Sequence, residues 1–117
     1  MKSYKNTVLK GYNGCKLMIV MDDQQEELTL WHVMFALQKK MPVNNLEEAK
    51  QARLLLDTIA ESRGKATLTI EESVYDWIKK YAETLCANLW RENAIEIIDT
   101  LIKGFMEPKQ NDEKHTR

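Results

Sequence analysis

The fold is organised around residues 29–40, which read Thr-Leu-Trp-His-Val-Met-Phe-Ala-Leu-Gln-Lys-Lys. Apolar residues recur at the spacing of one helical face, at Leu30, Val33, Met34, Leu37 and Met41. Trp31 and Phe35 cover a second face, and a helix that is apolar on most sides is typically buried between other elements. Thr29 can cap the first turn with its side-chain oxygen. We therefore predict a central helix over residues 29–41.

The composition is that of one soluble globular domain: 117 residues, 44% apolar and 30% charged. The 17 basic and 18 acidic residues give a net charge of −1, which argues against a large field of one sign for nucleic acid or a membrane. No apolar run is long enough to span a membrane, and no export signal is recognisable. We therefore expect a cytoplasmic protein in which Cys15 and Cys86 are free thiols, the alternative being a disulfide between them.

Residues 7–21 are predicted to form an N-terminal β-hairpin. Asn13 and Gly14 lie between two apolar runs, and both residues tolerate the positive φ of a tight hairpin turn. The second strand is apolar on both faces from Leu17 onward. One face can pack on helices, and the other is left for a third strand, a partner chain or solvent. Residues 1–6 are polar and are expected to fray.

Helical spacing of apolar residues predicts three further helices, at residues 46–63, 70–85 and 89–106. Capping boxes, in which a polar cap is followed three residues later by Glu, begin the first two, at Asn45–Glu48 and Thr69–Glu72. The apolar stripe changes phase near residues 86–88, which indicates a break with Asn88 as the next cap. A single helix that changes partners halfway is the alternative.

These elements predict an α+β fold that is mainly α, with an N-terminal β-hairpin packed on a bundle of about four helices. We expect one domain over residues 1–108. Residues 109–117 are charged and polar, and a disordered tail is expected there.

Few residues suggest catalysis. His32 lies inside the central helix, where a structural role is expected, and His115 lies in the tail. A small hydrolase that uses Cys86 or His32 is a third hypothesis, although no base lies beside Cys86 in sequence. The acidic run at residues 22–27 lacks the glycine and the alternating ligands of a calcium loop. With no phosphate-binding loop either, the sequence predicts no catalytic residue, no metal site and no cofactor.

The candidates for binding a partner are Tyr75, Leu54 and Ile95, which lie off the apolar stripes, Lys79 and Lys80, which lie on the polar side of their helix, and Trp90, which lies on the stripe of the last helix. Trp is favoured as an interface anchor, and a place in the core is the competing interpretation of Trp90. Surplus apolar surface on the helices, or the open hairpin edge, predicts a homodimer. Lysines and arginines are interleaved with acidic residues along the chain, which is typical of a mixed solvated surface; a basic strip gathered by the fold is the alternative.

Residues 68–72 read Leu-Thr-Ile-Glu-Glu and residues 78–81 read Ile-Lys-Lys-Tyr, between two helical segments. This pattern resembles small helical accessory proteins of phages and prophages. The resemblance implies a non-enzymatic regulator or inhibitor that binds a host or phage protein. The expected function is therefore a protein-interaction module, and the alternative is a transcriptional regulator that binds nucleic acid through a helix pair and a basic strip.

Overall fold

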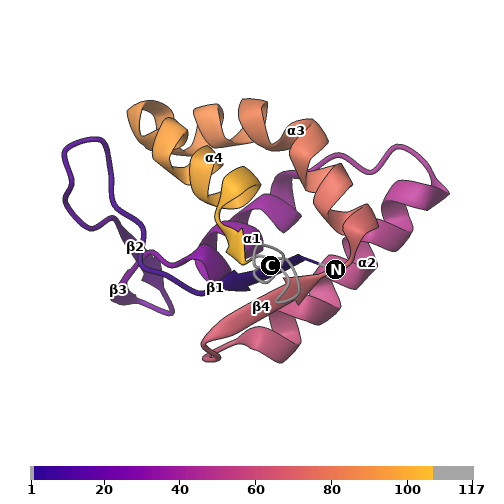
Figure 1. Ribbon diagram of the computed structural model, residues 1–117, viewed down its shortest axis with the longest axis horizontal. Helices are drawn as coiled ribbons and strands as arrows, with labels where there is room; N and C mark the ends of the chain where they lie inside the picture. The colour runs from indigo at the N-terminus through magenta and orange to yellow at the C-terminus, as the bar shows by residue number, and fades with distance from the viewer. Residues whose placement is uncertain (1, 107–117) are drawn as a thin grey trace, which may run out of the picture.

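The computed structural model describes residues 2–106, which form an α+β fold that is mainly helical, as predicted. The strands are β1 (Lys2–Lys5), β2 (Met18–Met21), β3 (Gln24–Glu27), β4 (Thr67–Ile70) and β5 (Phe105–Met106). The helices are α1 (Leu30–Lys40), α2 (Leu46–Ser62), α3 (Glu72–Trp90) and α4 (Ala94–Lys103), with a 3-10 turn at Arg91–Asn93 (Figure 1). The predicted tail at 109–117 and the end of the predicted domain at 108 lie outside the described residues.

Helix α1 is the central element, and α2, α3 and α4 all pack against it. The predicted stripe is buried along its whole length, from Leu30 to Met41. Trp31 is buried on the second face, where its Nε1–H donates to the carbonyl of Ile59 on α2 at 2.9 Å. Contact with neighbours on both faces explains why α1 carries apolar residues around most of its circumference.

A three-stranded antiparallel sheet, in the order β4-β1-β5, joins three distant parts of the chain. β1 is the middle strand, with Tyr4 opposite Leu68 on one side and Phe105 on the other. The buried hydroxyl of Tyr4 donates to the carbonyl of Leu101 on α4. The expected fraying of residues 1–6 is therefore wrong for β1, because a short polar strand is stabilised by partners that only the folded chain provides.

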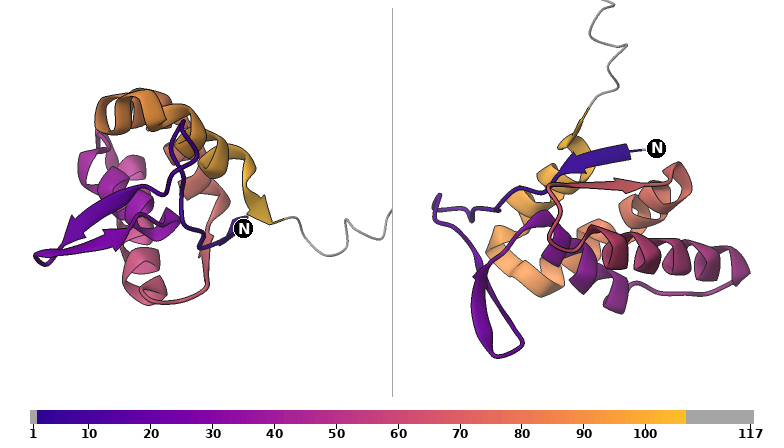
Figure 2. Two further views of the ribbon diagram at one scale, coloured as in Figure 1. Left: turned by 90° about the vertical axis from the view of Figure 1, so that its left-hand side faces the viewer. Right: turned by 90° about the horizontal axis from the view of Figure 1, so that it is seen from below.

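The N-terminal hairpin is present, but it is formed by β2 and β3 at residues 18–27 and not by residues 7–21. Met21 lies opposite Gln24, so Asp22 and Asp23 form the two-residue turn. Both aspartates have positive φ, 51° and 65°, which Asp tolerates better than most residues and which a tight hairpin turn requires. The acidic run at residues 22–27 is thus a turn followed by a strand. Figure 2 shows this hairpin projecting away from the helices.

The Asn13-Gly14 pair still reverses the chain. Gly14 has a φ of 81°, and its N–H donates to the carbonyl of Gly11 at 2.9 Å. The regular pairing beyond this loop is reduced to one bridge between Lys10 and Lys16. The predicted strands do not extend further because Leu9 and Leu17, the residues next to this bridge, also form backbone hydrogen bonds with Leu28.

The change of partner is made by a ring of backbone hydrogen bonds among three leucines. Leu9 N–H donates to Leu28, Leu28 N–H donates to Leu17, and Leu17 N–H donates to Leu9, at 2.8–2.9 Å. Leu9 and Leu28 are buried. A further hydrogen bond, from Tyr12 N–H to Asn93 Oδ1 at 3.0 Å, connects the loop at residues 11–14 to the 3-10 turn between α3 and α4. The hairpin is therefore anchored at its base, and at its turn Asp22 lies 3.6 Å from the guanidinium of Arg63.

Helix α3 extends beyond its predicted end. It ends at Trp90, and the break falls at Arg91, whose φ is 52°. The predicted cap Asn88 lies within α3, so the break at 86–88 was placed too early, although the phase change does mark two helices. α4 packs back on α3. The described residues thus contain three helical units, namely α1, α2 and the α3–α4 hairpin, and not the predicted bundle of four separate helices.

Candidate protein-binding groove

The structure places the predicted partner-binding residues on three helices. Leu54 on α2 and Ile95 on α4 are exposed, at 38% and 70%, and Lys79 and Lys80 on α3 are exposed as well. Tyr75 does not lie on the surface as a partner-binding residue would, because it is only 7% exposed. Its hydroxyl donates to the carbonyl of Ile102 at 3.0 Å, which holds the ring between α3 and α4. The spacing missed this because it did not show that α4 would fold back onto that side of α3.

Each remaining candidate has different neighbours. Lys80 lies 3.7 Å from a carboxylate oxygen of Glu48, at the start of α2. Leu54 borders a hollow shared with Thr69 of β4. Trp90 is half-buried and packs against the core. The chosen residues therefore do not make up one shared surface.

A groove that sequence reasoning did not identify lies between the projecting hairpin and the helices. Its volume is about 410 Å³. Strand β2 forms one wall, the C-terminal half of α1 forms the other, and the last turn of α3 contributes one residue. The lining includes Ile19, Val20, Phe35, Lys39, Lys40 and Leu89. We call this the β2 groove.

The wall formed by β2 has an unpaired edge. β2 and β3 make a two-stranded sheet, so each strand has a partner on one side only. In an antiparallel pair, alternate residues turn their N–H and C=O groups away from the partner. With the turn at Asp22-Asp23 and Val20 opposite Gln25, the outward residues are Met18 and Val20 on β2 and Gln25 on β3. Val20 is also 69% exposed.

Aromatic stacking rigidifies the helical wall. The rings of Trp31 and Phe35 are nearly parallel, 8° apart, with their centroids separated by 5.4 Å. Lys39 Nζ lies 4.4 Å from the centroid of Phe35, a cation–π contact that holds the ammonium group over the wall. Phe35 and Leu89 give the floor of the groove an apolar surface, and Lys39 and Lys40 make its rim positive.

A second, more polar cavity of about 310 Å³ lies beside β3 and includes His32. Thr29 N–H donates to His32 Nδ1 at 3.0 Å, so Nδ1 is an acceptor and the proton of the neutral ring is on Nε2. Nε2 in turn lies 3.2 Å from Glu26 Oε1. The Thr29 hydroxyl is also 2.9 Å from Nδ1. The hydroxyl, the imidazole and the Glu26 carboxylate are therefore arranged in the order of a nucleophile, a base and a carboxylate.

This arrangement is better explained as a helix cap. The single lone pair of Nδ1 already accepts the backbone N–H of Thr29, which is the bond that a Glu makes in an ordinary capping box. Glu26 then connects the cap to the hairpin. The buried His32 thus has the structural role that its position in the central helix suggested.

The cysteines also fit structural roles. Both are free; Cys15 is exposed and Cys86 is buried in α3. Burial raises the pKa of the Cys86 thiol to about 11, which disfavours the thiolate a nucleophile needs. Within residues 2–106, no group of three or more His, Cys, Asp or Glu side chains is placed to hold a metal ion. No helix in the described range is both long and apolar enough to cross a bilayer.

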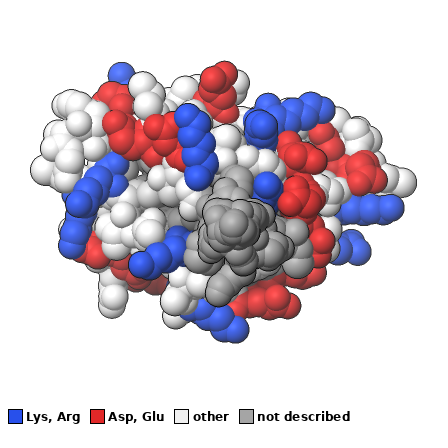
Figure 3. All heavy atoms as spheres, viewed as in Figure 1, with Lys and Arg blue, Asp and Glu red and all other residues white. Residues whose placement is uncertain are grey.

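The charges on one face of the molecule are mixed. On the face shown in Figure 3, lysines and arginines alternate with aspartates and glutamates, and no basic strip is seen there. Comparisons of the chain with protein-family models, with curated proteins and with solved structures find no match.

Proposed function

We propose that the chain is a non-enzymatic protein-interaction module that binds an extended segment of another protein along the β2 groove. The observation that carries the proposal is the outer edge of β2, which presents the backbone groups of Met18 and Val20 beside an apolar wall. Main-chain hydrogen bonds to such an edge supply affinity, and pockets for alternate side chains supply specificity. The apolar character of both faces of β2 is the sequence signal for this site.

Regulation or inhibition of the partner is the role that suits such a module, and the origin of that partner in a phage or its host stays a prediction. A reducing compartment such as the cytoplasm suits the two free thiols. Nothing in the mixed surface of Figure 3 favours the alternative of nucleic-acid binding.

A pair of proline variants tests the proposal. Val20→Pro removes the outward N–H from β2 and leaves the hydrogen bonds between β2 and β3 in place. Gln25→Pro is the matched control, because Gln25 lies opposite Val20 and its N–H points outward from the other edge. Random short peptides displayed on a surface would be selected on the wild-type chain, and the enriched peptides would be titrated against all three proteins.

We expect the Val20→Pro variant to bind the enriched peptides at least about tenfold more weakly, a loss of about 1.4 kcal/mol, and the Gln25→Pro variant to bind them as the wild type does. Amide exchange in β2 and β3 would verify that both variants keep the hairpin. Equal binding by all three proteins, or a selection that enriches nothing, would contradict the proposal.

A further inference from the structure

We infer that the β2 groove takes an extended segment of a foreign protein in which apolar residues alternate and an acidic residue lies next to them. This inference rests on the proposed function and names the chemistry of the partner. It follows from the direction of the side chains of an added strand, from the charges at the rim, and from the space available beside β2.

The side chains of an added strand would alternate between the groove floor and solvent. A strand that pairs with the edge of β2 continues the same pleated sheet, so every second side chain points to the face on which Ile19 and Met21 contact the core. On that side the floor consists of Phe35, Ala36 and Leu89. Apolar residues at every second position therefore fit the floor.

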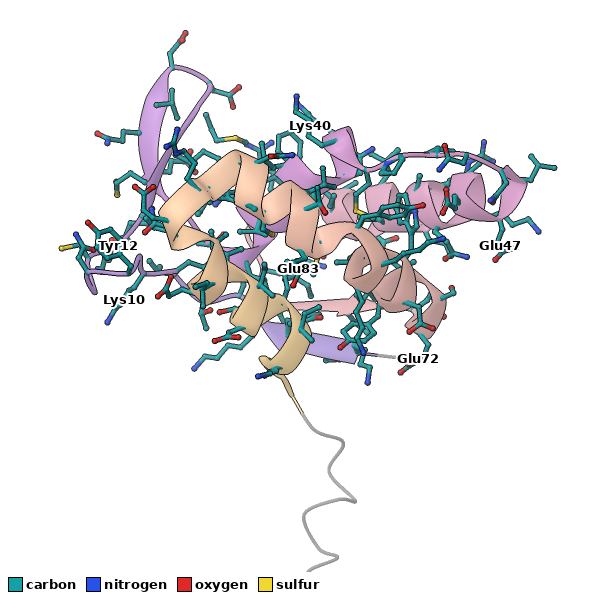
Figure 4. All side chains as sticks on the ribbon, turned by 90° about the horizontal axis from the view of Figure 1, so that it is seen from above. Lys10, Tyr12, Lys40, Glu47, Glu72 and Glu83 are labelled. Atoms are coloured by element: carbon teal, nitrogen blue, oxygen red, sulfur yellow. The ribbon has the colours of Figure 1, made fainter. Side chains whose placement is uncertain are left out.

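The rim determines the charge. Lys39 and Lys40 line the groove, and within the described residues neither of them forms an ion pair. The one carboxylate in the lining, Asp22, lies 3.6 Å from the guanidinium of Arg63. Two cationic side chains thus line the groove without an ion-pair partner among the described residues, and Figure 4 shows Lys40 projecting from the end of α1 on the side where the hairpin extends. A segment with Asp or Glu beside its apolar residues complements them.

A second copy of the chain fits less well. Antiparallel pairing of β2 with β2 of another copy requires a twofold axis perpendicular to the sheet, which puts the same face of both strands on the same side. Each strand would then bring its own α1 to the place that α1 and Leu89 of the other copy already fill. Pairs of Lys39 and Lys40 would also approach each other. A lone strand without a helix beneath it avoids both conflicts.

Charge reversal at the rim tests the inference. Lys39→Glu combined with Lys40→Glu reverses the rim, and Lys50→Glu combined with Arg53→Glu makes the same change of net charge on the exposed side of α2. The peptide selection would be run on the wild type and on both double variants, and the enriched sequences would be compared.

We expect the wild type and the α2 variant to enrich peptides with alternating apolar residues and adjacent Asp or Glu. The rim variant should bind those peptides about tenfold more weakly and should enrich Lys or Arg in place of the acids. A higher salt concentration should weaken the binding of the acidic peptides to the wild type.

The failures of the two proposals can be told apart. Two results would overturn the inference and leave the proposed function intact. In both, Val20→Pro weakens peptide binding; in the first the enriched peptides show no preference for Asp or Glu, and in the second they bind the rim variant as tightly as the wild type. Peptide binding that is unaffected by Val20→Pro would overturn both the proposed function and the inference. A wild-type dimer in light scattering that Val20→Pro dissociates, with no peptide competing, would assign the groove to a second copy and overturn the inference.

Discussion

Helix α1 and the β2–β3 hairpin are neighbours in sequence and differ in how their polar backbone and apolar side chains are used. α1 is enclosed: its stripe is buried and its ends are capped by Thr29 and Met41. The hairpin has only two strands, and all four residues of β3 are exposed. One element is stabilised by its surroundings on several sides, whereas the other has an unpaired strand edge and an exposed strand.

This difference separates stability from binding. Elements with few buried apolar contacts open at low free-energy cost without unfolding the core. The hairpin depends on the backbone hydrogen bonds among Leu9, Leu17 and Leu28 at its base and on contacts of Ile19 and Met21 with the core. Changes at its outer edge should therefore alter what the protein binds and leave folding almost unchanged, whereas changes in α1 should do the reverse.

The largest expected effect is a loss of stability in α1. Leu37→Ala removes a side chain that is fully buried, and the cavity left behind should lower the free energy of unfolding by about 2–5 kcal/mol. Val20→Ala on the hairpin edge should change it by less than about 0.5 kcal/mol. Urea titration followed by circular dichroism measures both. Similar losses in the two variants would contradict the division between core and edge.

The next effect concerns the strand that joins the termini of the described chain. Tyr4→Phe removes the hydroxyl that donates to the carbonyl of Leu101, and burial keeps the pKa of that hydroxyl above its usual range. Because the carbonyl of Leu101 is left without its donor, we expect a loss of about 1–2 kcal/mol. Tyr12→Phe, at an exposed loop residue, is the control and should melt with the wild type. Thermal unfolding of the three proteins distinguishes them.

The sequence was informative for part of the local structure, although the capping box predicted at Thr69–Glu72 is wrong, because Thr69 lies in β4 and Glu71 is the N-cap of α3. The stripe of α1, the caps at Asn45 and the phase change between the last two helices all follow from spacing within a few turns, and the structure has them. The pairing of β1 could not be found this way. Its partners are some 60 to 100 residues away, as the register of Lys2 with Ile70 and of Ser3 with Met106 shows.

Turn chemistry caused the main error. Asn13-Gly14 is the stronger hairpin signal, and it does reverse the chain, but pairing with the first strand ends at the hydrogen bond from Leu17 N–H to Leu9, and the Leu17 carbonyl accepts from Leu28. Tertiary contacts therefore moved the hairpin to a turn of two aspartates. The site was missed for the same reason, because the β2 groove exists only where that hairpin lies beside α1 and Leu89.

A smaller and opposite effect is expected at the hairpin turn. Asp23 has a φ of 65°, a conformation that costs an ordinary residue about 1 kcal/mol and costs glycine nothing. Asp23→Gly should therefore stabilise the hairpin by up to about 1 kcal/mol, and Asp23→Ala should not. Amide hydrogen exchange in β2 and β3 reports the change locally. Protection that falls in the glycine variant would show that the aspartate side chain, and not the backbone conformation, maintains the turn.

The smallest effect depends on pH and concerns the core side of the comparison. The pKa of Glu48 is lowered from its ordinary value of 4.5, first by the N–H of Asn44, then by the hydroxyl of Tyr81, with a smaller contribution from the Lys80 ammonium. A lowered carboxyl pKa contributes stability that is present above the pKa of the unfolded chain and is lost as pH falls through the pKa of the folded chain. Glu48→Gln should thus be less stable than the wild type at pH 7, and the two should converge in acid. Tyr81→Phe removes one of the two hydrogen-bond donors and should show the same trend with a smaller amplitude. Urea titrations at pH 7 and at acidic pH measure the free energy of unfolding of each protein. A difference between wild type and Glu48→Gln that becomes larger in acid would mean that the carboxylate does not stabilise the contact between α2 and α3.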